Sequence, residues 1–226
     1  MTVYISADAK NLREELASLR NQGGYQEQQF YFDSLVTNGT FDTATTGWTG
    51  TVSTLSVSSG NLRVTNTGTN GYASQSFLTE KGKQYRFSFS ANGGNASSVW
   101  VRVNDNAVQS SGTSVYYDST IGVSAGVVTG HFTAQATTSY IHLVANGAAA
   151  KYADFDNVFI YETDGTDVIH TMPKGWKPKD VFEDGLLQRE GAAHDYEVVY
   201  DGFDYFVKPT VAPSATTQTC VIGVKA

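Results

Sequence analysis

Apolar and polar side chains alternate in short runs through the middle of the chain, between residues 35 and 163. Val99, Val101 and Val103 illustrate this alternation, which is typical of a β-strand because successive side chains point to opposite faces of the sheet. Gly, Asn, Ser and Thr separate the runs. The runs that read as strands are 55–57, 61–65, 72–77, 84–91, 98–104, 127–134, 139–145 and 155–161. Short strands with frequent turn signals indicate an antiparallel β-sandwich of the jelly-roll type.

Residues 1–34 begin with apolar residues at helical spacing and end in a segment rich in aromatic residues. Three leucines are spaced as on one face of a helix that is too short to be stable alone in water. This stripe either docks on the sandwich or associates with other copies, most favourably as a trimer. The aromatic residues that follow predict an extended arm lying in a groove of a neighbour. The predicted assembly contacts are Leu12, Leu16, Leu19, Phe30 and Phe32.

Composition changes after residue 163, and residues 167–226 read as a small C-terminal β-domain. Its first part, residues 172–178, contains two prolines and is predicted to be an irregular connector. Further on, Asp201-Gly202 stands between alternating apolar residues, which is a strong hairpin signal. A two-residue loop at this point would place Tyr200 opposite Phe203.

Charge and composition exclude some classes of function. The formal net charge of −7 argues against binding a phosphate backbone, which needs a basic surface. No apolar run approaches the length of a membrane span, so no membrane insertion is expected. The start of the chain lacks the segments of a signal peptide. An all-β protein of low charge made without that signal suggests a virion protein, made in the host cytoplasm and released by lysis.

Several segments of the central region together resemble the jelly-roll carbohydrate-binding modules. They are Asn38–Asp42, Gly47-Trp48, Gln75, Gly82–Phe89 and Phe155–Val158. The resemblance covers about 125 residues, a usual domain size. It implies a jelly roll over residues 35–163, preceded by a short N-terminal helix and arm and followed by the small β-hairpin domain.

The same resemblance implies a structural calcium ion where the first and last strands of the jelly roll meet. Asp42 and Asp156 match the positions that would hold it. Carboxylates and backbone carbonyls suit Ca²⁺, which prefers oxygen ligands. The alternative is that Asp42 caps a turn and Asp156 pairs locally.

The glycan site of such modules, where one exists, is the solvent face of one sheet. If the three valines face the core, the residues between and beside them face out. The same argument applies to residues 139–145, and a loop between the two segments would line the rim. The predicted glycan contacts are Trp100, Arg102, Tyr116, Tyr117, Tyr140 and His142. The alternative is that Trp100 packs under a loop, against a neighbouring subunit or against the arm.

No arrangement of residues indicates an enzyme. Gly122–Gly126 matches a nucleophile-elbow pattern, but that motif needs a strand-to-helix turn and both neighbours read as β. The four histidines show no metal-ligand spacing. We therefore expect a protein without a catalytic site.

The C-terminal segment resembles a small β-domain of bacteriophage tail-fibre and related virion proteins. Val181–Gln188, Asp195-Tyr196 and Val211–Pro213 carry this resemblance. It implies a structural virion protein, a tail fibre or appendage that assembles with other virion proteins and contacts host glycans. A capsid decoration or head-fibre protein is one alternative. A non-viral carbohydrate-binding module is another.

Overall fold

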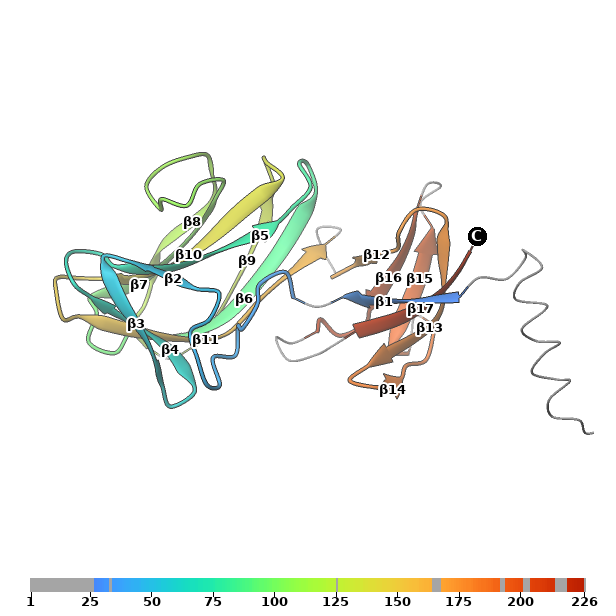
Figure 1. The fold of residues 1–226 in the computed structure, drawn as a ribbon, viewed down its shortest axis with the longest axis horizontal. Helices are drawn as coiled ribbons and strands as arrows, with labels where there is room; N and C mark the ends of the chain where they lie inside the picture. Colours follow the sequence, from blue (N-terminus) through green and yellow to red (C-terminus); the bar gives the residue numbers. More distant parts are fainter. Residues whose placement is uncertain are drawn as a thin grey trace, which may run out of the picture.

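The described part of the chain forms β-strands gathered in a larger and a smaller lobe (Figure 1). The computed structural model describes residues 27–32, 34–124, 126–163, 168–191, 194–200, 204–213 and 219–225, and for residues 27–32 only the backbone. Within these ranges every regular element is a strand, as the sequence predicts. They also contain no helix long and apolar enough to cross a membrane. The predicted leucine stripe, with Leu12, Leu16 and Leu19, lies outside them.

The larger lobe is a sandwich of two five-stranded antiparallel sheets. The first, called here the β10 sheet, consists in spatial order of β2 (Thr49–Thr51), β5 (Tyr72–Leu78), β10 (Thr138–Asn146), β7 (Ser98–Asn104) and β8 (Ser114–Ile121). The second, the β11 sheet, consists of β3 (Ser53–Ser58), β4 (Asn61–Asn66), β11 (Tyr152–Thr163), β6 (Gln84–Asn92) and β9 (Gly126–Thr133).

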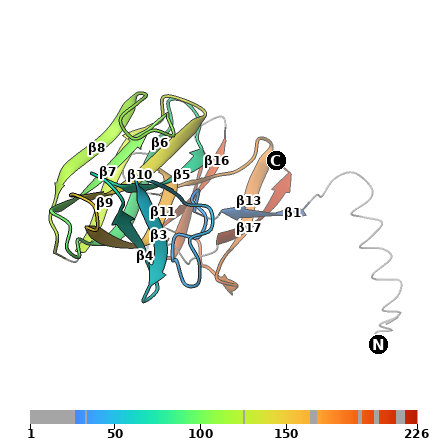
Figure 2. The same cartoon turned by 60° about the vertical axis from the view of Figure 1, so that its left-hand side comes forward.

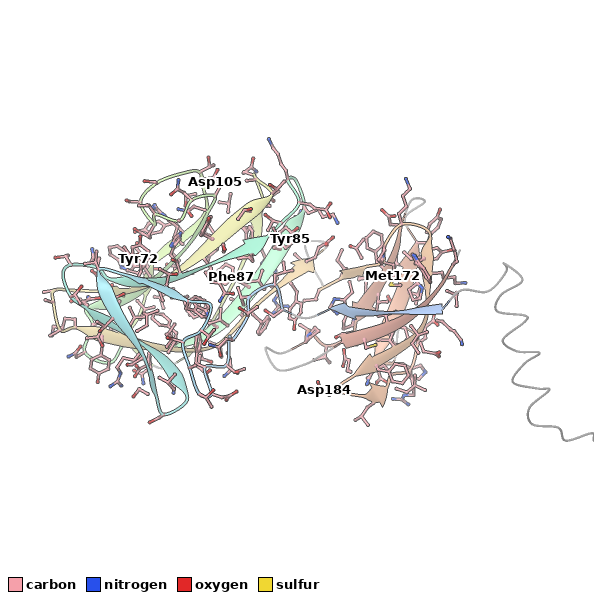
Figure 3. All side chains as sticks on the ribbon, viewed as in Figure 1. Tyr72, Tyr85, Phe87, Asp105, Met172 and Asp184 are labelled. Carbon is pink, nitrogen blue, oxygen red and sulfur yellow. The ribbon has the colours of Figure 1, made fainter. Side chains whose placement is uncertain are left out.

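The core between the two sheets is formed by the side chains that the alternation predicts. Val99, Val101 and Val103 of β7 are fully buried in it. Phe87 of β6 and Phe155 of β11 reach it from the opposite sheet, and Figure 3 shows Phe87 inside the sandwich. Burying large apolar side chains of this kind contributes roughly 1.5–3 kcal/mol each.

The segment that opens the jelly roll is tied to the sandwich by polar side chains. The amide of Gln75 accepts a hydrogen bond from the backbone N–H of Thr37 (2.6 Å) and donates one to its carbonyl (3.0 Å). The indole of Trp48 donates to the same carbonyl at 3.2 Å and packs 5.4 Å from the ring of Phe41. Residues that carry the resemblance in sequence therefore act here as structural anchors.

The smaller lobe contains two further antiparallel sheets. One consists of β1 (Glu27–Phe32), β17 (Thr219–Lys225), β13 (Trp176–Glu183) and β14 (Leu186–Leu187). The other consists of β12 (His170–Thr171), β16 (Tyr205–Pro209) and β15 (Tyr196–Tyr200). Their shared core includes Met172, Val181 and Val207, and Figure 3 shows Met172 at its centre.

The arm strand β1 belongs to the smaller lobe although it precedes the sandwich in sequence. It pairs with β17 of the same chain, with Phe30 opposite Val221 and Phe32 opposite Thr219. Both views show these strands side by side (Figures 1 and 2). The extended conformation was predicted correctly. The backbone of β1 pairs with the chain's own last strand, and contact of the arm's aromatic rings with a neighbour stays a prediction.

Three local predictions are wrong. Ser114–Ile121, expected as a loop, is strand β8. Its polar sequence and its irregular register with β7 give no regular apolar alternation from which a strand could be predicted. The connector around Pro178 belongs to β13, where a register shift after this residue accommodates the missing N–H. The hairpin exists, but Tyr200 pairs with Tyr205 rather than Phe203, so its loop has four residues instead of two.

Candidate functional site

The outer face of the β10 sheet, which points away from the sandwich core, carries most of the predicted glycan contacts. His142 lies opposite Arg102 across the β10–β7 pair, and Trp100 lies opposite Val144. Tyr140 is on the same face, half-buried, two residues from His142. The predicted alternation of these side chains is therefore observed, while their exposure differs from the prediction.

Three of these residues form an exposed group, called here the Trp100 cluster: Trp100, Arg102 and Tyr117. The Trp100 and Tyr117 rings meet edge to face, with centroids 6.3 Å apart. The guanidinium of Arg102 lies 4.6 Å from the centre of the Tyr117 ring, a cation–π contact. Tyr117 is 47% exposed, and Trp100 and Arg102 are partly exposed. The cluster thus presents two rings and a cation at the β7–β8 edge of the sheet.

Hydrogen bonds at the Ser98 hydroxyl fix the orientation of Trp100. Its indole N–H donates to the hydroxyl of Ser98 at 2.9 Å, and the Asn146 side chain donates to the same hydroxyl at 2.8 Å. Because the indole N–H is already bonded, what Trp100 offers to a ligand is the surface of its ring.

His142 is fully buried, so its predicted role as an exposed contact is wrong. Its Nε2 atom lies 2.8 Å from Oδ1 of Asn104 and 3.2 Å from the carbonyl of Asn106. Burial lowers the pKa of His142 to about 4; the Asn106 contact opposes this change and the charge of Arg102 adds to it. His142 is therefore a neutral structural group at neutral pH.

Tyr116 is also placed differently from the prediction. It is on β8 and points toward the sandwich interior, where its ring meets Phe87 edge to face at 4.8 Å. Tyr116 and Tyr117 are neighbours on one strand, so they face opposite sides of the sheet. Only Tyr117 joins the Trp100 cluster.

The cover over His142 is the loop of residues 105–113 between β7 and β8. Figure 3 shows Asp105 of this loop beside the sandwich strands. The Asn104 side chain, fully buried, donates to the carbonyls of Val108 (3.2 Å), Gln109 (3.3 Å) and Ser111 (2.7 Å). Asn104 was not among the residues predicted from the sequence. The turn-forming run Asn104-Asp105-Asn106 signals a turn, but not that the turn folds back over the sheet.

At the predicted calcium position, the carboxylates of Asp42 and Asp156 are close enough for their charges to interact. Oδ1 of Asp156 is buried with no hydrogen-bond partner, while its Oδ2 accepts from the Asn157 side chain at 2.8 Å. Burial raises the pKa of Asp156, and the charge of Asp42 raises it further. The Asp42 carboxylate is exposed and accepts from the hydroxyl of Thr40 at 2.9 Å. An orphaned buried carboxylate oxygen beside a second carboxylate fits a hard divalent cation.

This position supplies few side-chain ligands. Among the described residues, no three His, Cys, Asp or Glu side chains come together as a metal site. An ion held by Asp42 and Asp156 would need backbone carbonyls to complete its oxygen ligands. Asp154, close by in sequence, is committed elsewhere, because it forms a two-bond ion pair with Arg63 at 2.8 Å.

A separate surface pocket of about 440 Å³ lies away from both positions. Its lining is mostly apolar: Leu35, Leu78, Thr79, Glu80, Tyr85, Thr137 and Glu162. The charges at its rim are neutralised, since Lys83 lies 3.3 Å from Glu80 and 3.2 Å from Glu162. The Tyr85 ring is only 3% exposed and offers no stacking surface.

Comparisons with solved structures give similarities that cover part of the chain. No protein-family model matches the chain, and no curated protein does. Among solved structures, a carbohydrate-binding module of family 4 aligns at 18% identity and a TM-score of 0.45, covering 57% of this chain and 99% of that one. The N-terminal cellulose-binding domain of Cellulomonas fimi β-1,4-glucanase C aligns at 24% identity and a TM-score of 0.42, covering 57% of this chain and 97% of that chain.

A family 61 module in complex with β-1,4-galactotriose aligns at 14% identity and a TM-score of 0.44, covering 58% of this chain and 100% of that chain. The three structures named here are carbohydrate-binding modules or domains.

Proposed function

We propose that the chain is a non-catalytic glycan-binding protein whose sugar contacts come from the Trp100 cluster. The observation that carries this proposal is the pair of rings formed by partly exposed Trp100 and exposed Tyr117, with Arg102 beside them. Aromatic rings stack on the apolar face of a sugar, and nearby polar groups bond to its hydroxyls. In this arrangement Trp100 supplies the stacking surface, while Tyr117 supplies a second ring and a hydroxyl.

The fixed orientation of the cluster favours binding. Trp100 is held by Ser98, and Arg102 donates from Nη1 to the carbonyl of Gln109 at 2.6 Å. Side chains that are already ordered lose little conformational entropy when a ligand arrives. A glycan array probed with the full chain tests the proposal. Retention of particular glycans is expected, and a blank array at micromolar protein would contradict it.

We also propose that Asp42 and Asp156 hold a structural Ca²⁺ ion. The ion would supply positive charge to the buried Oδ1 of Asp156 and join the first loop to the last strand. At a calcium concentration 100-fold above Kd, binding stabilises the fold by about 2.7 kcal/mol, or roughly 10 °C in Tm. Melting with calcium and with EDTA measures this difference. Asp156→Asn should abolish it, while the control Glu80→Gln should retain it; equal midpoints for the wild type would refute the ion.

A second candidate function is structural, as a virion tail fibre, tail appendage or capsid decoration protein. The observation that favours assembly is the exposed apolar edge strand β14, where Leu186 is 72% and Leu187 is 62% exposed. Unpaired edges and exposed apolar residues promote association between chains. A homotrimer with three times the chain mass of 24.4 kDa is expected in sedimentation, and Leu187→Glu should reduce it. A monomeric wild type would contradict self-assembly, and electron microscopy of labelled virions would locate the protein on tail or head.

A further inference from the structure

The outer face of the β10 sheet is divided into a covered part and an open part. Tyr72, His142 and Asn104 belong to strands β5, β10 and β7 and are 7%, 0% and 0% exposed, although they lie outside the sandwich core. The face is open at the Trp100 cluster on β7 and β8, where Tyr117 is 47% exposed, and also farther along β5 and β10, where Ser76 is exposed and Tyr140 is half-buried. The middle of the sheet is therefore covered, and its β7–β8 edge is accessible.

The loop of residues 105–113 makes this division, and it is fastened to three strands. It receives the Asn104 side chain from β7, it contacts His142 of β10 through the Asn106 carbonyl, and the Gln109 N–H donates to the Tyr72 hydroxyl of β5 at 3.3 Å. At its base the Thr113 N–H donates to Oδ1 of Asp105 at 2.6 Å. Because these bonds span the sheet, the loop is part of the folded face.

A sugar chain stacked on Trp100 and bonded to Tyr117 would not continue across the middle of this sheet. The path from β8 toward β5 passes Arg102 and then His142, which is fully buried against the loop and the rings of Tyr72 and Tyr140. Arg102 itself is tied to the loop through Gln109. Sugar units beyond the first one or two would project into solvent and gain no contacts with the sheet.

We propose that the Trp100 cluster recognises one or two sugar units at the end of a glycan, and that loop 105–113 sets this specificity by covering the middle of the face next to the cluster. The proposal rests on the glycan-binding function above and adds the class of ligand to it. Its consequence is that affinity does not grow with the length of a linear oligosaccharide beyond the disaccharide.

The test is an array that carries mono-, di- and hexasaccharides of equal linkage, including cellobiose with cellohexaose and galactobiose with galactohexaose, followed by calorimetry on the sugars retained. Affinities of disaccharide and hexasaccharide within about two-fold of each other, or retention of monosaccharide termini alone, support the proposal. A hexasaccharide bound ten-fold or more tightly than its disaccharide overturns it and leaves glycan binding intact. An array without any retained glycan overturns the proposed function as well.

A loop variant adds an independent readout. Asn104→Ala removes the side chain that holds the carbonyls of Val108, Gln109 and Ser111, so the loop should become sensitive to limited proteolysis. With the loop released, the hexasaccharide should gain affinity over the disaccharide. A released loop with an unchanged affinity ratio would contradict its role in specificity.

Discussion

The burial of His142 predicts how the stability of the fold depends on pH. Its pKa is lowered from 6.5 to about 4 by burial under loop 105–113, so protonation favours the unfolded chain. The sign follows from linkage: between these two pKa values the unfolded state binds more protons, so stability falls as pH falls through this window. At about 1.4 kcal/mol for each pKa unit, the full window corresponds to about 3 kcal/mol.

The variant His142→Gln removes the titrating group and keeps an N–H donor for Asn104. At pH 7.5 it should be less stable than the wild type by about 1–2 kcal/mol, because the ring contact with Tyr72, 5.3 Å between centroids, is lost. The deficit should shrink and reverse as pH approaches 4. Urea unfolding followed by tryptophan fluorescence from pH 4 to 7.5 measures both curves, with exposed His131→Gln as control. Parallel curves for His142→Gln and wild type would refute the burial argument.

Three further perturbations test the architecture and the ion site. A Cβ at Gly39 would collide with the carbonyl oxygen of Val158, so Gly39→Ala should cost about 1–3 kcal/mol in urea unfolding, whereas Gly122→Ala, with open space around it, should cost less than about 0.5 kcal/mol. Gln75→Ala removes both hydrogen bonds that its amide forms with the backbone of Thr37, so the N–H of Thr37 loses its acceptor and the carbonyl keeps only the Trp48 indole; the free energy of unfolding should fall by about 1–3 kcal/mol, and no loss would show that these two bonds are dispensable. Stabilisation by calcium should weaken as pH falls, since the raised pKa of Asp156 lets protons compete with the ion, and a pH-independent effect would point to other ligands.

Much of the sandwich could be predicted because its signal is local. The valines of β7 alternate with residues of the outer face, such as Trp100 and Arg102, and burial on one face requires that alternation. The hairpin register could not be obtained in this way. A shift by two residues leaves every side chain on the same face, so Val198 meets Val207 as readily as Tyr205 and the pattern cannot separate a two-residue from a four-residue loop.

The site was predicted in part for a related reason. Alternation places Trp100 and His142 on the outer face, but exposure depends on what covers the face. The cover is a loop held by Asn104 and Tyr72 through contacts between residues up to 37 positions apart. Such contacts leave no periodic trace in sequence, so His142 was expected outside and is found buried.

The most direct test of glycan binding by the Trp100 cluster is the affinity of Trp100→Ala for the glycan that the wild type retains best. Calorimetry on the full chain should show a loss of about ten-fold or more, since a central aromatic contact carries much of the binding energy at such sites. Val127→Ala, 72% exposed on the opposite sheet, serves as control and should bind as the wild type does. Wild-type affinity in a folded Trp100→Ala protein would contradict the account.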